Sequence, residues 1–356
     1  MEGDAKYLRI TDIVPYFVNK EQVPFCKIDD NKKKKYLISE NDLLIARTGA
    51  TTGYNLVVDE SYKNFVFASY LIRFNYNKNE LYPLYLKYVL KSQQWYGFVN
   101  NFISGSAQPG MNAKVFGKFQ IPFFNYDIQK RISNILSTYD KLIDNNNKRI
   151  KLLEQMAENL YKEWFVRFRF PGYEDAEFEN GIPKEWEYTK LERLANISTG
   201  KCNREDAEED GAYPLFDRSQ EIKRSNVWLK DCEAIIVPGE GTSFIPRYYN
   251  GKFNLHQRCY CVEPSEKGMG FFLYQTLMMY RKYFLYVATG ATVPSLRLNN
   301  FNNFKALLPK KELCFQYNGI AEKMNDEILL LKNKNELLTK QRDLLLPRLM
   351  SGKLEV

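Results

Sequence analysis

The side chains that usually carry out catalysis are scarce in this sequence. One histidine is present, His256, so any catalytic system built on an imidazole base would depend on it alone. The six cysteines form no C-x-x-C pair, and in a chain of 356 residues without an export signal we expect them to stay reduced. The glycine-rich motifs that cradle nucleotide phosphates are also absent from the sequence. We therefore predict no catalytic residue, no metal ion and no cofactor in this chain.

One set of charged residues supports a different interpretation. Asp210, Glu221 and Lys223 superficially resemble the Asp…Glu-x-Lys metal site of many nucleases. The Glu-x-Lys tripeptide arises by chance in most charged proteins, however, and this set occurs in only one half of the chain. A metal-dependent nuclease is kept as one alternative, and a coiled-coil scaffold that does not bind DNA is kept as another.

The charge balance permits a polyanionic partner without requiring one. Lys and Arg number 51 against 43 Asp and Glu, a formal net charge of +8, but a lysine-rich solvated surface gives the same value. Hydrophobic residues make up 44% of the chain, which is enough for a sizeable core. No stretch approaches the roughly 18 apolar residues that a membrane helix needs, so we expect a cytoplasmic protein without a membrane partner.

The sequence contains an internal duplication. The elements that position any functional residue are therefore expected to occur twice. The matching stretches are 104–109 with 289–294, Phe116 and Phe119 with Phe301 and Phe304, 42–51 with 233–242, and 67–74 with 255–262. Several matches in the same order, with only small shifts, are not expected by chance. A repeat of this length indicates two whole domains rather than a solenoid.

Each copy ends in a long amphipathic stretch. Apolar residues recur at alternating spacings of three and four, from about 126 to 165 and again from about 316 to 346, which predicts two long helices. One asparagine interrupts each apolar seam, either as an exposed position or as a polar residue that fixes the register of a helix pair. Because the seam recurs in both halves, we predict that the helices pair antiparallel, through Ile143, Asn146, Ile150, Leu153, Leu331, Asn335 and Leu338.

The length of these helices is relevant to function. Forty helical residues rise about 60 Å, which is longer than one turn of B-DNA at roughly 34–36 Å. Two related domains on such a spacer suit a DNA site in two parts, in which the separation of the parts is specified as well as their sequence. Coiled-coil spacers join many kinds of domain, so this geometry alone does not decide the function.

Seven motifs in a fixed order carry a resemblance to a known family. They lie at residues 7–13, 42–53, 105–109 and 116–122 in the first copy, and at 186–194, 198–201 and 290–294 in the second. In this order they resemble the specificity (S) subunit of type I restriction-modification systems. The resemblance extends over nearly the whole chain.

The resemblance implies a fold and a non-catalytic function. It implies an α+β fold with two strand-rich target recognition domains, each followed by a long helix, and a pseudo-twofold repeat in which the helices pair as an antiparallel coiled coil. Each domain would read one half of a bipartite, asymmetric site in double-stranded DNA. The helices would set the spacing and dock methylation (M) subunits, of which we expect two, while restriction (R) subunits join through the complex. S-adenosylmethionine, ATP and Mg²⁺ would then be bound by these partners.

The motif order predicts four segments of the chain. They are a first target recognition domain at 1–122, a helical spacer at 123–170, a second recognition domain with its linker at 171–309, and a second helical spacer at 310–356. The second copy contains a stretch between Trp186 and Tyr213 that has no match in the first copy. We therefore expect the first recognition domain to be shortened at its start.

Candidate DNA contacts in the first domain come from polar residues on predicted loops, where glycines let a backbone approach a duplex. An ordinary hairpin turn around residues 48–53, a solvated loop at Lys33 and Lys34, and a structural turn at 105–109 are the alternatives. The candidates are Arg47, Thr48, Thr51, Thr52, Tyr54, Lys33, Lys34, Gln108, Asn112, Lys114 and Lys118.

The second domain offers a corresponding set. His256 lies beside a strand pattern, and a histidine satisfied within that strand is the alternative to a DNA contact. The candidates are Arg218, Gln220, Lys223, Arg224, Arg247, Tyr248, His256, Gln257, Arg258 and Arg297.

Overall fold

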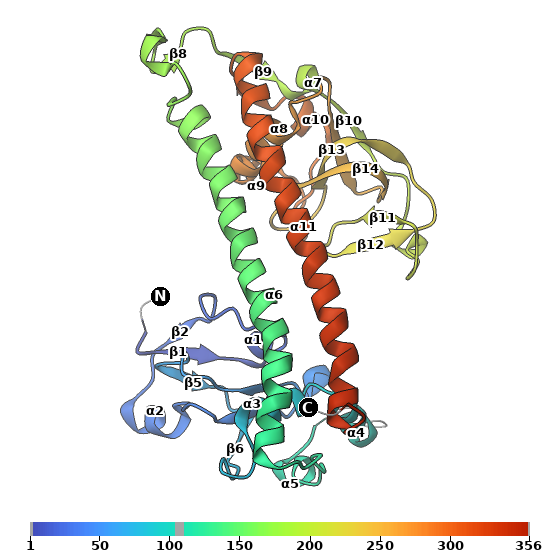
Figure 1. Ribbon diagram of the computed structural model, residues 1–356. Helices are drawn as coiled ribbons and strands as arrows, with labels where there is room; N and C mark the ends of the chain where they lie inside the picture. Colours follow the sequence, from blue (N-terminus) through green and yellow to red (C-terminus); the bar gives the residue numbers. More distant parts are fainter. Residues whose placement is uncertain (1–2, 104–109, 355–356) are drawn as a thin grey trace. The chain divides into compact units, whose positions relative to one another are not determined.

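The structure, a computed structural model, describes residues 3–103 and 110–354, which group into two compact units (Figure 1). The first unit comprises Met1–Lys148 with Leu331–Val356, and the second comprises Arg149–Leu330. Both long helices contribute residues to both units, and the boundaries of the four predicted segments stay a prediction. In the described part of the chain, no helix combines the length and apolarity needed to cross a lipid bilayer.

The first unit combines short strands with helices. Its elements are β1 (Ala5–Leu8), α1 (Ile10–Ile13), β2 (Phe25–Cys26), α2 (Asp30–Tyr36), β3 (Leu43–Ala46), β4 (Asn55–Val57), β5 (Phe65–Phe67), β6 (Leu71–Phe74), α3 (Pro83–Val89), α4 (Gln93–Ile103), α5 (Ala113–Phe116) and the first part of α6 (Tyr126–Tyr161). The strands form two sheets, in the orders β2-β1-β5 and β4-β3-β6.

The second unit has one large sheet. Its elements are β7 (Phe178–Glu179), β8 (Ile182–Pro183), β9 (Glu187–Lys190), α7 (Leu191–Leu194), β10 (Ala195–Thr199), β11 (Tyr213–Phe216), β12 (Ile222–Ser225), β13 (Lys230–Pro238), β14 (Arg247–Leu255), β15 (Cys259–Pro264), α8 (Gly270–Met279), α9 (Arg281–Val287), α10 (Leu298–Asn302), β16 (Lys305–Leu308) and part of α11 (Lys311–Met350). The sheet order is β10-β15-β13-β14-β11-β12, with the pairs β16-β9 and β7-β8 beside it.

The two units share one strand topology, which confirms the duplication. In the first unit β3 pairs antiparallel with β6 on one side and with β4 on the other. In the second unit β13 pairs antiparallel with β15 on one side and with the first part of β14 on the other. The first unit also has a parallel pairing of β1 with β5 and an antiparallel edge strand, β2, next to β1. The second unit has the parallel pairing of β11 with the end of β14 and the antiparallel edge strand β12 next to β11. The single long strand β14 thus corresponds to β4 and β5 together.

The strand ladders correct the sequence alignment by one residue at one turn. The sequence match places Arg47 over Pro238, yet Ala46 pairs with Leu71 as Pro238 pairs with Cys259. The next residue obeys the same shift, since the Arg47 carbonyl accepts from the Met111 N–H as the Gly239 carbonyl accepts from the Leu296 N–H. Thr48 of the first unit is therefore the positional equivalent of Glu240.

The opening part of the second unit has no counterpart in the first, as the sequence predicts. In the second unit β10 pairs with β15 over five residues, and β9 pairs with β16. Within residues 3–103 and 110–148, no strand lies on the outer edge of β6, and residues 119–122 form no strand. Among these described residues β6 is therefore the edge strand of its sheet, whereas β10 is the edge strand at the equivalent end of the second sheet.

The two long helices run side by side and antiparallel within each unit (Figure 1). Asn125 starts α6, because its Oδ1 accepts from the N–H of Ile128 at 2.9 Å. In the second unit the Tyr317 hydroxyl of α11 donates to the carbonyl of Ala157 on α6 at 3.0 Å. Residue numbers rise along one helix as they fall along the other, which confirms antiparallel pairing. Of the predicted pairing residues, Ile143, Asn146, Ile150 and Leu331 are buried, and Leu153, Asn335 and Leu338 are half-buried.

The two asparagines of the seams meet in the first unit. The Asn146 side-chain amide donates to Asn335 Oδ1 at 2.8 Å, and the Asn335 amide donates to Asn147 Oδ1 at 2.9 Å. The prediction that these polar residues lie at the helix contact is confirmed. A paired amide in an apolar seam disfavours shifted registers, which would leave each amide without its partner.

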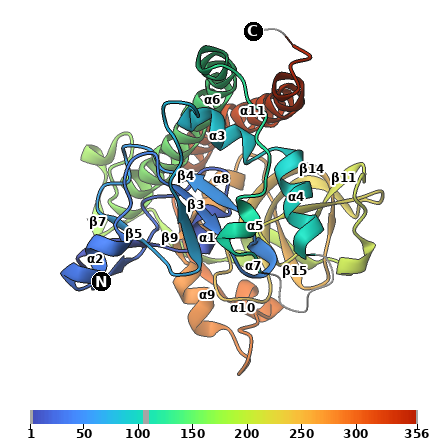
Figure 2. The ribbon, with the colours of Figure 1, turned by 90° about the horizontal axis from the view of Figure 1, so that it is seen from below.

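A buried ion pair joins α11 to α6 and α3, whose helices lie together in Figure 2. Asp140 accepts from Arg342 at 2.9 Å, from Lys87 at 2.9 Å and from the Tyr88 hydroxyl at 2.8 Å. Burial alone would raise the pKa of Asp140, but these donors outweigh it and lower that pKa. The guanidinium of Arg342 also lies over the Tyr16 ring, 3.9 Å from its centroid.

The Asp140→Asn substitution should destabilise the first unit by about 3–5 kcal/mol, because it removes the buried carboxylate that Arg342 and Lys87 share and leaves Arg342 with the exposed Asp343 alone. Since the folded pKa of Asp140 lies below its unfolded value, its contribution is present above about pH 4 and is lost as the pH falls through the folded pKa. Calorimetric unfolding measures both effects. The control is Asp144→Asn in the exposed Asp144–Lys148 pair, which should change stability by no more than about 0.5 kcal/mol; equal losses in both variants would contradict the assignment.

The asparagine pair can be tested by a double-mutant cycle. Asn146→Leu or Asn335→Leu alone leaves the other amide without its partner and should cost about 1–3 kcal/mol. The double variant should cost less than the sum of the two, because neither amide then remains unpaired. Urea unfolding of the four proteins gives the coupling energy. Strict additivity would show that the two amides contribute independently.

Candidate nucleic-acid interface

Three segments that directly follow strands of the second unit form a polar cleft of about 310 Å³. Residues 217–219 follow β11, residues 240–241 follow β13, and His256 follows β14. Arg204 and Val293 complete the lining. Asp217 and His256 are buried in the floor of the cleft, whereas Arg204, Arg218 and Ser219 are exposed, so the accessible side chains of the cleft are mainly polar.

Two predicted arginines meet at one acidic residue in this cleft. Arg218 Nη1 lies 2.6 Å from Glu240 Oε2, and Arg258 Nη1 lies 2.9 Å from Glu240 Oε1. Both guanidinium groups remain about half exposed, while the Glu240 side chain is 16% exposed. The structure thus brings together two candidates that are 40 residues apart in the sequence, through a residue that the sequence analysis did not select.

Two other predicted cations stabilise the loop that carries Arg218. Arg247 donates to the backbone carbonyls of Asp217 at 2.6 Å and Ser219 at 2.9 Å, and burial lowers its pKa. Lys223 forms an ion pair with Asp217 at 2.7 Å, which outweighs the effect of burial and lowers the pKa of Asp217 to about 2. Arg247 and Lys223 thus have partners within the unit, and their predicted DNA contact stays a prediction.

The single histidine is a structural residue of the turn between β14 and β15. His256 is 6% exposed, and its Nδ1 accepts from the Arg258 N–H at 3.0 Å. Burial and the neighbouring Arg218 lower its pKa, so the imidazole is neutral at pH 7. The alternative of a satisfied strand histidine holds. Gln257 beside it is exposed, and its amide donates to Asn203 Oδ1 at 2.6 Å.

Tyr248 lies on the opposite side of the strand from Arg247, because successive side chains of a strand alternate. Its ring stacks on Phe271 of α8 with centroids 4.0 Å apart, and its hydroxyl donates to Glu233 at 2.8 Å. Tyr248 is therefore half-buried and packs against the core, and its predicted DNA contact stays a prediction. The guanidinium of Arg224 donates to the Gly211 carbonyl at 2.8 Å and ties β12 to the preceding loop.

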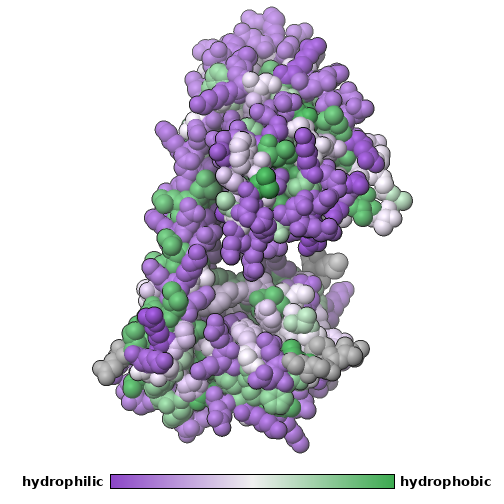
Figure 3. Space-filling model, turned by 90° about the vertical axis from the view of Figure 1, so that its right-hand side faces the viewer, coloured by the Kyte–Doolittle hydropathy of each residue, from purple (hydrophilic) through white to green (hydrophobic). Residues whose placement is uncertain are grey.

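Two further candidates lie on the surface of the second unit, whose visible face is mostly hydrophilic (Figure 3, upper part). Arg297 and Gln220 are exposed. Burial raises the pKa of Tyr260, and the positive charges of Arg297 and Arg258 partly offset that rise.

The first unit presents its own polar surface at the equivalent turn. Arg47 is exposed, and its backbone binds Tyr70 on one side and Met111 on the other. Thr48 forms a bridge with Gly110, as Glu240 does with Ser295. Gly49 has a φ of 75°, and a Cβ at this position would meet no atom. Arg47, Thr48 and Gly49 thus form an accessible turn.

The segment after this turn carries two exposed lysines. Asn112 caps α5, because its Oδ1 accepts from the Val115 N–H at 3.1 Å, and this leaves its amide nitrogen for another partner. Lys114 and Lys118 are exposed on and just after this short helix. Gln108, the remaining candidate of this segment, lies outside the described residues.

Several candidates of the first unit point inward. Thr52 is 4% exposed and donates to the Gly49 carbonyl at 2.8 Å, so its side chain is used within the turn, and its DNA contact stays a prediction. Gly53 packs against Val99, where a Cβ would approach within 2.7 Å, so it serves packing rather than a duplex. Tyr54 is half-buried against the Tyr96 ring, and Thr51 is half-buried with it. The turn is therefore partly structural, as the hairpin alternative stated.

The lysine run of the first unit forms a helix rather than a loop. α2 begins at Asp30, because the Asp29 carboxylate accepts from the N–H of Lys32 at 2.9 Å. Lys33 is half-buried and donates to the Asp4 carbonyl at 2.9 Å, whereas Lys34 is exposed. Lys34 is thus the better placed of the two to meet a phosphate.

The nuclease alternative receives no support from the structure. Lys223, the cation of the supposed metal site, is bound to Asp217. Asp210 and Glu221 are both exposed, and neither belongs to a cluster of potential metal ligands in the described residues. The Asp210, Glu221 and Lys223 set therefore lacks the arrangement of a metal-dependent nuclease.

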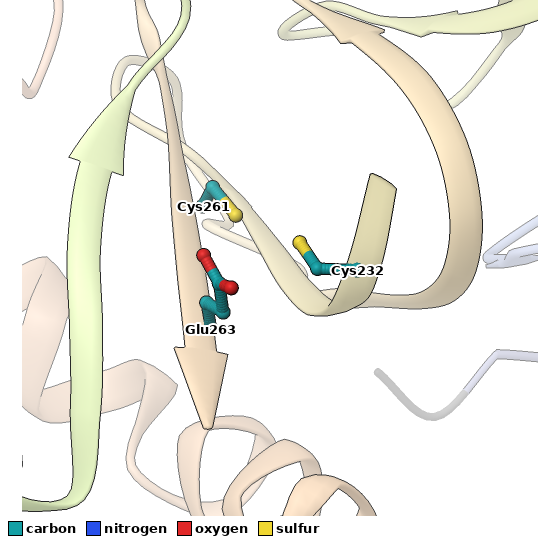
Figure 4. Close-up of side chains that lie close together, drawn as sticks. All are labelled: Cys232, Cys261 and Glu263. Carbon is teal, nitrogen blue, oxygen red and sulfur yellow. The ribbon is translucent and has the colours of Figure 1, made fainter. Parts of the chain in front are cut away.

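The described residues contain one group that has the atom types of a metal site, shown in Figure 4. The Cys232 and Cys261 thiols and the Glu263 carboxylate lie within 4.8 Å of one another. A hydrogen bond from Cys261 lowers the pKa of Cys232, and Lys230 pairs with Glu263 at 3.1 Å. Because Lys230 already neutralises the carboxylate, we assign this group no role in DNA recognition.

Three residues of the two surfaces were missed by the sequence analysis. Glu240 was overlooked because an acidic residue does not attract a polyanion, and no pattern in the sequence distinguishes Arg204 from other surface cations. Tyr70 is 57% exposed and occupies the position in the first unit that Arg258 occupies in the second. The equivalence of the strand ladders identifies Tyr70, and that equivalence can be recognised only once the correct strand register is known.

Two duplicated units that present polar turns at equivalent positions, each with exposed cations nearby, are the arrangement expected of a class of proteins that recognise an extended polyanion with paired modules. The sequence profile of the type I restriction modification DNA specificity domain matches residues 3–155 and 183–342. The MjaIX type I restriction enzyme specificity subunit of Methanocaldococcus jannaschii is 25% identical over 300 residues, 76% of this chain and 69% of that protein. The HindI specificity subunit of Haemophilus influenzae is 21% identical over 417 residues. The match covers 92% of this chain and 91% of the HindI subunit.

A solved structure shows the same fold. The crystal structure of the type I restriction-modification S subunit from M. genitalium superposes with a TM-score of 0.60 and 17% identity. The match covers 98% of this chain and 89% of the M. genitalium chain. The chain therefore belongs to the type I restriction modification DNA specificity domain family and carries two copies of the domain. It is a specificity subunit, which recognises DNA sequence and is not itself an enzyme.

The exposed lysines of the first unit should bind DNA through its phosphates. The Lys114→Gln/Lys118→Gln variant should weaken DNA binding by a similar factor for all sequences and flatten the salt dependence of log K by roughly 0.9 for each lost phosphate contact. Binding of the complex with methylation subunits is measured at several salt concentrations. Lys184→Gln, in an exposed pair with Glu177, is the control and should leave the slope unchanged. A loss confined to one target sequence would show base reading instead.

Proposed function

We propose that each unit reads one half of a bipartite, asymmetric site in double-stranded DNA. The observation that carries this proposal is the equivalence of the two surfaces. Thr48–Gly110 and Glu240–Ser295 are the same backbone bridge in the same topology, yet the side chains differ. A common scaffold with different polar residues at one position suits two readers of different sequence.

The contacts divide by chemistry. Exposed side chains with several donors or acceptors suit base edges, and single positive charges suit phosphates. In the first unit we assign base reading to the turn with Arg47, Thr48 and Asn112, and phosphate contacts to Lys34, Lys114 and Lys118. In the second unit the contacts are Arg218, Gln220, Gln257, Arg258 and Arg297, with Arg204 added by the structure.

The long helices set the spacing between the two half-sites and dock the methylation subunits. A helix of 36 residues, the length of α6, rises about 54 Å. Large apolar side chains remain exposed on both helices, which is typical of a surface that meets another protein. They are Leu142, Leu152 and Met156 on α6, and Leu329, Leu330, Leu337 and Leu344 on α11.

The remaining components belong to the assembly. Two methylation subunits, one for each half-site, bind S-adenosylmethionine and transfer the methyl group to adenine N6, and restriction subunits supply ATP- and Mg²⁺-dependent cleavage. The whole complex acts in the cytoplasm, where the DNA is accessible to it. The specificity subunit in this scheme needs no cofactor of its own.

Methylome sequencing of cells that express this chain with its methylation subunits tests the proposal. The wild type should methylate a motif of two short defined parts separated by a fixed number of unspecified bases. The variant Arg47→Ala/Thr48→Ala should relax the specificity of one part and leave the other part and the spacing unchanged, because the two units read independently. Lys184→Gln serves again as the control. Simultaneous loss of both parts, or an undivided motif, would contradict the assignment of one half-site to each unit.

A further inference from the structure

We propose that Glu240 is a positioning residue for base recognition, which holds Arg218 and Arg258 as a pair that reads guanine. This inference rests on the proposed function, in which the second unit reads one half-site. Each oxygen of the Glu240 carboxylate binds one arginine, at 2.6 Å and 2.9 Å. One acidic residue therefore fixes the directions of two long side chains that would otherwise be mobile.

The backbone that carries this trio is fixed from several sides. Glu240 forms a bridge with Ser295, and the N–H groups on either side of it donate to the carbonyls of Arg258 and Pro294. The loop with Arg218 is fixed by its neighbour Asp217, whose Oδ1 accepts from the Ser219 N–H at 2.8 Å. Fixed anchors of this kind reduce the entropy lost when the arginines meet a base.

The charge arrangement suits a base edge better than a phosphate. A phosphate contact needs net positive charge, but the Glu240 carboxylate cancels one of the two guanidinium charges and repels a phosphate oxygen. Recognition of a guanine edge depends instead on the orientation of the donors, because guanine O6 and N7 accept from two parallel N–H groups of one guanidinium. Each arginine uses Nη1 for Glu240 and is about half exposed, so further N–H groups face solvent.

The first unit has different residues at all three equivalent positions. Thr48 stands for Glu240 and Tyr70 stands for Arg258, according to the β3–β6 and β13–β15 ladders. Ile10 stands for Arg218, because Leu8 and Phe216 hold the same place in the β1–β5 and β11–β14 pairings. The guanine-reading pair is therefore specific to the second unit, which gives the bipartite site one of its asymmetries.

Selection from a random duplex library by the complex with methylation subunits tests this role. The wild type should select at least one guanine in one part of its motif. Glu240→Gln should lower the preference for that guanine by about 5- to 150-fold, the discrimination of one bidentate contact, and leave the other part of the motif unchanged. Arg218→Lys and Arg258→Lys keep the charge but lose the two-donor geometry, and should relax the same positions.

Matched controls separate this role from a structural one. Glu266→Gln removes the exposed Lys311–Glu266 pair of the same unit and should leave the motif unchanged. The melting temperature of Glu240→Gln should lie within a few degrees of the wild type. If that variant fails to fold, the two Arg→Lys variants decide the question by the positions that they relax.

Each outcome bears on one proposal. A motif with no guanine at the positions that these variants relax, or a Glu240→Gln motif identical to the wild type, overturns the role of Glu240 while the bipartite function stands. Loss of preference in both parts together also overturns it, because a positioning residue acts only on its own contacts. A wild-type complex that selects no sequence at all refutes the proposed function itself.

Discussion

The antiparallel contact between α6 and α11 is the constraint on which both units depend. Each unit takes residues from both helices, and the first unit joins two separate stretches of chain, Met1–Lys148 and Leu331–Val356. In the first unit the contact includes the Asn146–Asn335 amide pair and the buried Asp140–Arg342 ion pair. In the second, Tyr317 of α11 is buried and binds the Ala157 carbonyl of α6. Polar contacts at defined positions fix one register, which apolar packing alone specifies less strongly.

Periodicity and duplication allowed most of the fold to be predicted from the sequence. Long helices produce a regular apolar pattern over many turns, so the start of α6 at Tyr126 was located correctly. The second helix extends beyond its predicted bounds at both ends, because its first and last turns carry no regular seam. The one-residue error at Arg47 arose because matching of residue types tolerates a shift at a glycine-containing turn, whereas a strand ladder does not.

The recognition surface was harder to predict, because identical residue types serve opposite purposes. Arg247 and Arg258 are both arginines near strand ends, yet the first is bound to two backbone carbonyls and the second is about half exposed and paired with Glu240. Only the tertiary fold shows which carbonyls lie within reach of a guanidinium. Glu240 shows the reverse case, since an acidic side chain gains its importance from two cations that are distant in the sequence.

The uncovered edge of β6 has a consequence for how the first unit avoids self-association. An exposed strand edge offers unpaired backbone groups to any other extended chain, and proteins protect such edges by short length or by charge. β6 has four residues and carries Arg73, whose guanidinium binds the carbonyls of Leu37 and Lys35. In the second unit β10 pairs with β15 and is itself the edge strand, so at this end of the sheet each unit relies on an edge strand of only four or five residues, too short to template a long pairing.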